Sequence, residues 1–296
     1  MLRSIPASAP GRAAKAAPRR GPARLAVRHP LAVAGVLMIG VWLAAILGAP
    51  WIAGDRPLRQ DLAQRLKPPS AAHPFGTDNL GRDVFARVLY GGRVSVPVGV
   101  AVIAATAGIG TALGGAAGFA GGWLDEAVMR TADVVLAFPP IILALAIAAA
   151  LGPDLHNVVI ALVAVWWPYY ARMMRGVTLS IKEHEYVLAA RAAGASPART
   201  FFGSVLLNAY TPILVLATID IGSGITAAAA LSFLGLGVRP PTPEWGAMVA
   251  QGAELLDRWW LAAFPGLAIL TVVLALNFIG DSMRDLLDPR LRHLRQ

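Results

Sequence analysis

Long apolar stretches with very few charged residues set the strongest limit on how this chain can fold. A helix of about 20 such residues crosses the ~30 Å hydrocarbon core of a bilayer. Within lipid, a helix also satisfies all of its own backbone polar groups, which an open strand does not. The stretches lie at about 31–53, 94–118, 128–151, 157–175, 209–235 and 259–281. The sequence therefore predicts an all-α integral membrane protein with six transmembrane helices.

The composition agrees with this class. Charged residues make up 15% of the chain and hydrophobic residues 56%, whereas soluble domains carry about 25% charged residues. The net charge of +9 does not predict nucleic-acid binding, because the basic residues lie between the apolar stretches and form no single basic face with interleaved aromatics. The absence of cysteine excludes disulfides and thiolate metal sites.

Candidate catalytic and metal-binding groups are scattered along the chain. His73, His156 and His184 lack the spacing of metal ligands, so we predict no metal site. The acids near the C-terminus alternate with arginines, which is typical of a solvated helix end. No GxxxxGK[ST] run is present, so we predict that this chain neither binds ATP in that way nor catalyses a reaction.

The first apolar stretch follows a basic segment. Residues 1–30 contain seven Arg or Lys residues and no Asp or Glu, and much of the rest is Pro, Ala and Gly. This composition predicts a disordered basic tail that can rest on anionic lipid. A cleaved signal peptide has the same order, but its apolar part is only about 7–15 residues long. The length of 31–53 favours an uncleaved first span.

The distribution of basic residues predicts the orientation. If the N-terminus is cytoplasmic, 17 of the 26 Lys and Arg residues lie in inner segments and 9 in outer segments. Basic residues are enriched in cytoplasmic loops, so we expect both termini in the cytoplasm of a multi-pass protein of the cell membrane. The predicted divisions are a tail at 1–30, a first span plus extracytoplasmic segment at 31–93, a core at 94–282 with a cytoplasmic loop at 178–208, and a C-terminal tail at 283–296.

Small residues in the second predicted span indicate close helix packing. Gly110, Gly114, Gly118 and Gly122 recur every four residues, which gives a ridge where another helix can approach closely. The ridge packs either inside this chain or at a boundary with another subunit.

The loop at 178–208 carries two helix signals in succession. Glu185 to Ala193 is alanine-rich, and Gly194 follows as a left-handed stop. Ser196 is a good N-cap and Pro197 a good first helical residue, so a second short helix begins at once. A plain connecting loop has little need for two capped helices, and the small side chains can seat closely in a groove of another protein.

The same loop resembles the EAA loop of ABC-importer permeases. The resemblance rests on Ala189-Ala190, then Gly194, then a hydrophobic run, with Leu188 in place of the family's glutamate and Leu207 in place of its late proline. In that family, the loop is the coupling helix that docks on the ATPase subunit. The resemblance implies ATPase-coupling roles for Tyr186, Ala189, Ala190, Arg191, Gly194 and Ala195.

Three further motifs are similar to those of the second permease subunit of dipeptide, oligopeptide and nickel importers. They are HPFGTDNLGRDVFARVLYGGRVS from His73, LSFLGLGVRPPTPEWGAMVAQG from Leu231 and NFIGDSMRDLLDPRLR from Asn277. This resemblance implies a type I ABC-importer permease core that forms half of a translocation pathway for a short peptide or another small solute. It also implies a heterodimer with a homologous permease, two ATPase subunits that bind ATP and Mg²⁺, and an extracytoplasmic substrate-binding protein.

Two polar sites allow alternative interpretations. Asp220 lies within a predicted span, where a carboxylate usually faces a cavity or a partner, so it belongs either to the pathway or to packing between subunits. Glu244 and Trp245 follow a proline-rich run that favours a structural turn, and contact with the binding protein is the alternative.

Other transport classes fit less well. An ion-gradient-driven secondary transporter with Asp220 as its ion site typically has inverted repeats and broken helix pairs, and the sequence has no such symmetry. A membrane-embedded hydrolase needs convergent polar groups within the spans, and none is evident.

Overall fold

The computed structural model describes residues 30–287, and this part of the chain contains helices and connecting segments but no β-strand. The prediction of an all-α protein is thus confirmed. Residues 1–29 of the predicted basic tail and residues 288–296 lie outside the described residues. The helices are α2 (Pro30–Ala53), α3 (Val84–Ala120), α4 (Gly122–Leu136), α5 (Pro140–Leu151), α6 (Leu155–Ile181), α7 (Glu185–Ala192), α8 (Pro197–Thr200), α9 (Leu207–Phe233), α10 (Trp245–Ala253) and α11 (Trp260–Leu287), with a 3₁₀ turn at Leu62–Gln64 and a π-helical segment at Phe201–Leu206.

Several helices are long and apolar enough to cross a membrane. Four meet both conditions on their own: α2, α3, the continuous run Pro197–Phe233, and α11. The pair α4 and α5 would make a fifth if it counts as one broken span. α6 has 27 residues, about 40 Å of helix, but it carries Arg172 and Arg175 and is less apolar. A multi-pass fold is established, while the count of six spans stays a prediction.

The predicted single span at 128–151 is wrong in its geometry. The chain bends by 91° between α4 and α5. Pro139 and Pro140 stand at the bend, and Pro139 has an extended ψ of 123°. A residue that precedes proline is driven out of the helical region by a clash with the proline ring, and proline itself has no N–H for the helix ladder. The pair therefore ends one helix and starts the next.

α3 begins earlier than predicted. Its first residue is Val84 instead of about 94, because the carboxylate of Asp83 accepts a hydrogen bond from the Ala86 N–H and caps the helix. At 1.5 Å per residue, the 37 residues of α3 span about 55 Å. This length exceeds the ~30 Å hydrocarbon core, so α3 projects well beyond it.

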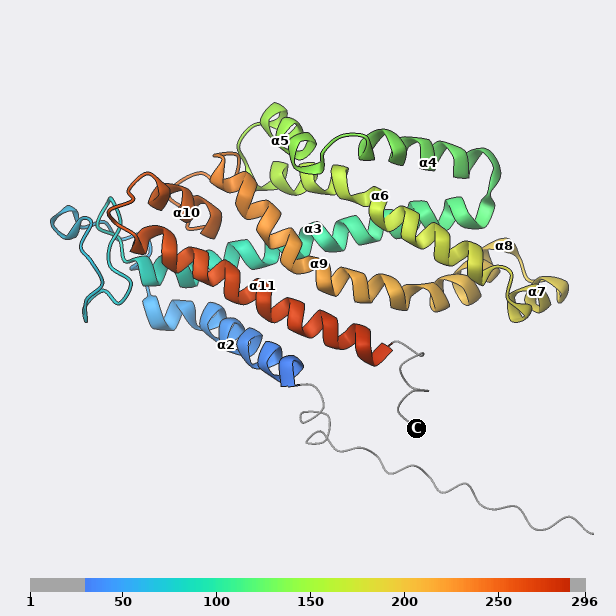
Figure 1. Ribbon diagram of the computed structural model, residues 1–296, viewed down its shortest axis with the longest axis horizontal. Coiled ribbons are helices and arrows are strands. Elements are labelled where there is room, and N and C mark those ends of the chain that lie inside the picture. The colour runs from blue at the N-terminus through green and yellow to red at the C-terminus, as the bar shows by residue number, and fades with distance from the viewer. Residues whose placement is uncertain (1–29, 288–296) are drawn as a thin grey trace, which may run out of the picture.

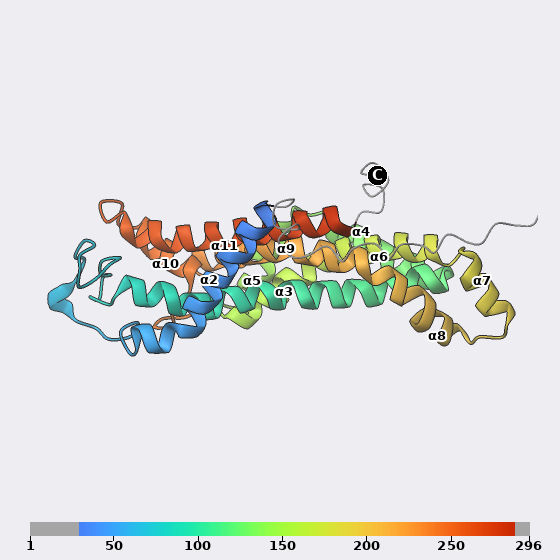
Figure 2. The same cartoon turned by 90° about the horizontal axis from the view of Figure 1, so that it is seen from below.

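The helices form an elongated bundle (Figures 1 and 2) that packs around two large apolar clusters and a smaller one between α2 and the start of α3. The first joins α3, α5, α6 and α9 through residues such as Val102, Leu162 and Leu231. The second joins α2, α3, α10 and α11 through residues such as Ile46 and Trp260. α11 lies against α2 and α9, so α2 joins the bundle chiefly through α11 and the first part of α3.

The glycine ridge packs inside the chain. Gly110, Gly114 and Gly118 are buried, and a Cβ at each would meet α6, including the Ala171 carbonyl at Gly114 and the Arg175 carbonyl at Gly118. The structure thus supports intramolecular packing over a subunit boundary. Gly122 is not part of the ridge, because it begins α4 with a positive φ of 59° and open space around it.

The two ends of the bundle differ in content. The irregular segment 54–83 and α10 lie at one end, and α7 lies at the other (Figures 1 and 2). The start of α2 and the end of α11 both point toward the α7 end (Figure 1). Both ends of the described chain therefore face the end of the bundle where the predicted coupling loop lies, although both stop well short of it (Figure 1).

Candidate functional site

The conformation predicted around Gly194 is confirmed. α7 ends at Ala192, Gly194 has a φ of 82°, and the Ser196 side chain accepts a hydrogen bond from the Arg199 N–H at the start of α8. Pro197 is the first helical residue. The two helices therefore meet at a left-handed joint followed by a capped start.

The predicted second short helix is not separate. α8 continues through the π-helical segment into α9, and the helical run extends from Pro197 to Phe233. The predicted loop 178–208 is likewise shorter, because α6 extends to Ile181. Ser196-Pro197 thus starts a helical run that continues into the apolar span, and the loop proper covers only 182–196.

α7 is held against the end of α3. The Lys182 ammonium donates to the Gly118 carbonyl at 3.1 Å, which satisfies one of the terminal carbonyls of α3. The Arg191 guanidinium lies over the Phe119 ring at 5.2 Å. Phe119 in turn packs against Phe201, with ring centroids 5.3 Å apart. Arg191 therefore also contacts its own chain, a contact that the sequence did not predict.

The remaining predicted coupling residues form a mostly exposed surface. Tyr186 and Leu188 are 45% and 47% exposed, while Val187 between them is fully buried in the core. Ala189 and Gly194 are exposed, and Ala190 and Ala195 are half-buried. α7 thus presents one aromatic ring and several small side chains on a helix that is anchored from behind, which suits insertion into a groove of another protein.

A cavity of about 450 Å³ lies between α6 and α9. Ligand pockets typically measure about 300–1,000 Å³. The lining residues are Trp166, Tyr169, Tyr170, Leu216, Asp220 and Ser223. The Tyr170 hydroxyl donates to the Asp220 carboxylate at 2.8 Å. The structure thus places Asp220 in a cavity wall together with Trp166, Tyr169 and Tyr170. From the sequence, these aromatics suit either an interfacial belt or the lining of a pore, and their place in the cavity wall favours the second interpretation.

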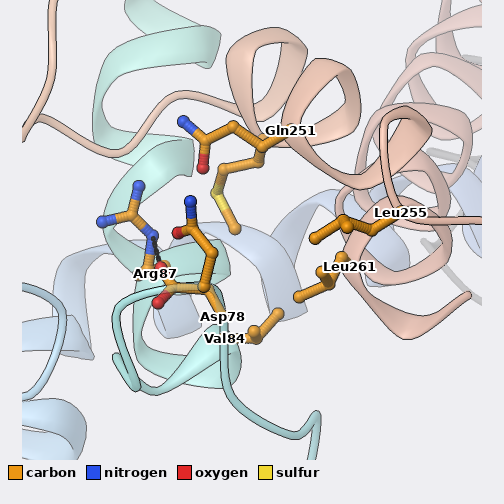
Figure 3. Close-up of a pocket in the computed structure, with 8 residues that line it drawn as sticks. Asp78, Val84, Arg87, Gln251, Leu255 and Leu261 are labelled. Atoms are coloured by element: carbon orange, nitrogen blue, oxygen red, sulfur yellow. Dashed lines mark ion pairs between the residues drawn. The ribbon is translucent and has the colours of Figure 1, made fainter. Parts of the chain in front are cut away.

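A second, much smaller cavity lies at the end of the bundle opposite α7, between the start of α3 and α10 (Figure 3). Its volume is about 10 Å³, which is room for one water at most. Asp78 pairs with Arg82 at 2.7 Å and with Arg87 at 3.5 Å, and all three residues are buried. Arg87 also donates to the carbonyls of Pro57 and Pro241. This cluster of buried ion pairs and hydrogen bonds joins three segments that are distant in the sequence. Its role is structural, since no ligand fits.

Glu244 and Trp245 join the start of α10 to α3 in the same region. The Glu244 carboxylate caps α10 by accepting from the N–H groups of Gly246 and Ala247, and it also accepts from the Ser95 hydroxyl. The Trp245 indole donates to the Val88 carbonyl at 2.8 Å, and its ring is fully buried. A buried pair does not contact another protein, so the structural interpretation of this motif holds. The sequence did not predict that Ser95 bonds Glu244 or that Arg87 bonds the Pro241 carbonyl, although both residues lie in the motif that begins at His73.

Comparison with known proteins identifies the family. The family model described as "Binding-protein-dependent transport system inner membrane component" matches residues 110–293. The chain belongs to this family. The match begins within α3 and includes the predicted coupling loop, the cavity between α6 and α9, and α10 and α11. Family membership and the apolar helices together establish a multi-pass inner-membrane protein.

Curated relatives of the family extend the likeness. A probable D,D-dipeptide transport system permease of Escherichia coli (strain K12) is 45% identical over 262 residues, which cover 88% of each chain. A dipeptide transport system permease of Alkalihalophilus pseudofirmus is 41% identical over 266 residues, covering 90% of this chain and 88% of the relative. A glutathione transport system permease of Escherichia coli O6:K15:H31 is 42% identical over 267 residues, with 90% and 88% covered. These alignments are longer than the family match, so they include residues before Gly110.

Proposed function

We propose that this chain is one permease subunit of an ATP-driven importer and forms half of the membrane pathway for short peptides. The observation that carries the proposal is the continuous helix from Pro197 to Phe233. One end of this helix adjoins the exposed α7, and its middle bears Leu216, Asp220 and Ser223 in the cavity wall. A displacement of α7 therefore has a rigid route to the cavity, roughly 30 Å along the helix at 1.5 Å per residue.

The partners follow from the incomplete surfaces of the chain. The complex contains two ATPase subunits, which bind ATP and Mg²⁺, and one of them docks on α7 of this chain through Tyr186, Ala189, Ala190, Arg191, Gly194 and Ala195. A homologous permease completes the pathway opposite α6 and α9 as a heterodimer, and an extracytoplasmic substrate-binding protein delivers the cargo. Two relatives named for dipeptide transport support peptides as that cargo. This chain itself binds no cofactor and catalyses no reaction.

Both termini are cytoplasmic in this proposal. The excess of basic residues on one side, 17 of 26, supports that orientation. The start of α2 and the end of α11 point toward the α7 end of the bundle (Figure 1), where cytoplasmic ATPases would dock. The segment 54–83 and α10 then form the outer surface that faces the binding protein.

Uptake by the purified complex tests the proposal. The complex is reconstituted in liposomes with its binding protein on the substrate side, and accumulation of radiolabelled alanyl-alanine is measured with ATP, with a non-hydrolysable analogue, and with an ion gradient alone. We expect uptake only with ATP. Uptake driven by an ion gradient without ATP would favour a secondary transporter, and no peptide uptake at all would contradict peptide import.

A further inference from the structure

The wall of the cavity between α6 and α9 carries one acid and no base. Asp220 is its only ionisable carboxylate, and neither Lys nor Arg lines it among residues 30–287. No basic side chain within those residues forms an ion pair with Asp220. A carboxylate within a span is costly unless it faces water or a cation. This site therefore favours a cationic group over an anionic one.

The geometry leaves one carboxylate oxygen available. The Tyr170 hydroxyl donates to Oδ2 of Asp220 at 2.8 Å, and no donor within the described chain bonds the other oxygen, Oδ1. Three aromatic side chains, of Trp166, Tyr169 and Tyr170, line the same cavity as the carboxylate. Aromatic faces attract ammonium groups, and a carboxylate forms charge-assisted hydrogen bonds with them.

We infer that Asp220 recognises the free ammonium group of the cargo as it crosses the membrane, with Tyr170 fixing the carboxylate and the neighbouring rings surrounding the cation. The inference rests on the proposed function, because it assigns the amine end of a peptide to this subunit. An unmodified peptide carries an α-amino group with a pKa of about 7.7–8.0 and is mostly cationic at pH 7. An N-acetylated peptide carries no such cation, so this wall should bind it less tightly.

Substitution of Asp220 by asparagine isolates the charge. In Asp220→Asn, the carboxamide oxygen can still accept the Tyr170 hydrogen bond, since the two side chains have the same shape. Packing of α6 against α9 is thereby kept while the negative charge is removed. Asp133→Asn is the matched control, because Asp133 is exposed on α4, pairs with Arg172 and does not line the cavity.

The test measures weak binding of peptides to the assembled complex. The binding protein is left out, because it selects cargo itself and would mask the preference of the membrane subunits. Saturation-transfer NMR compares alanyl-alanine with N-acetyl-alanyl-alanine on wild type, Asp220→Asn and Asp133→Asn. We expect wild type and Asp133→Asn to bind the free amine about tenfold more tightly than the acetylated form, as a charge-assisted hydrogen bond allows. In Asp220→Asn the two peptides should bind equally weakly.

Three results would overturn the inference. The first is a wild type without preference for the free amine, and the second is an Asp220→Asn complex that keeps the preference. The third is dissociation of the Asp220→Asn complex from its sister permease on gel filtration, which would assign Asp220 to a subunit contact. If the wild-type complex takes up alanyl-alanine with ATP but shows no preference for the free amine, only the inference about Asp220 fails. If it takes up no peptide with ATP, the proposed function and the inference both fail.

Discussion

Gly194→Val should lower peptide uptake and ligand-stimulated ATP hydrolysis together while the helices stay folded. Gly194 has a φ of 82°, and a side chain at this position would meet no atom within 4 Å. The cost of the substitution is therefore conformational and not steric. A residue with a Cβ pays roughly 1–2 kcal/mol in the left-handed region, and a β-branched residue such as valine is a genuine outlier there.

The strain can be relieved by a shift of α7, because the joint lies outside the apolar spans. A penalty of about 1.4 kcal/mol corresponds to a tenfold change in population. If that strain opposes the docked conformation, peptide uptake and ligand-stimulated ATPase activity should fall together by about five- to thirtyfold across the 1–2 kcal/mol range. A graded series tests the cause: Gly194→Asn should be mild, since asparagine tolerates positive φ, with Gly194→Ala intermediate and Gly194→Val worst.

The assay is reconstitution of each variant with measurement of both activities and of complex assembly. Gly203→Val is the matched control, because Gly203 lies nine residues onward in a π-helical segment without a positive φ and also has open space. Full activity of Gly194→Val, or an equal loss in Gly203→Val, would refute the idea that this joint transmits the motion.

Two further predictions concern the packing that supports the site. Gly114→Val should reduce the yield of folded protein on fluorescence-detected gel filtration, because its Cβ would collide with the Ala171 backbone of α6 and overpacking costs about 1–3 kcal/mol or more. Gly108→Val, on the same helix in open space, should not reduce this yield. Equal yields for the two variants would contradict the packing of Gly114 against α6. Glu244→Ala should lower the thermal stability of the complex, because it removes the cap of α10 and the acceptor of the Ser95 hydroxyl, at about 1–3 kcal/mol. Glu254→Ala, at an exposed position, is its control. An equal melting temperature for both variants would contradict a structural role for the contacts of Glu244.

Local signals made the coupling segment predictable. A helix stop at glycine and a start at Ser196-Pro197 depend on a few neighbouring residues, so the conformation follows from the sequence alone. The same kind of signal was available at Pro139-Pro140, where apolar composition on both sides obscured it and a straight span was predicted. Composition reports burial in lipid and does not report the direction of a helix.

Contacts between distant segments were not predictable. The Trp245 indole bonds the carbonyl of Val88, 157 residues away, and Tyr170 reaches Asp220 across 50 residues. Each pairing depends on how two helices lie against one another, which a single sequence does not specify. Asp220 was identified from the cost of a charge in the membrane, whereas the aromatic wall beside it became evident only when α6 and α9 were placed together.

Photo-crosslinking from α7 tests the central claim most directly. A photo-reactive phenylalanine analogue is placed at position 189, which is exposed on α7, and the assembled complex is irradiated. The control places the same analogue at position 70, an exposed position in the segment 54–83 at the opposite end of the bundle (Figure 1). We predict a crosslink from position 189 to an ATPase subunit, and none to an ATPase from position 70. Crosslinks to the ATPase from position 70, or none from position 189 in an active complex, would contradict the account.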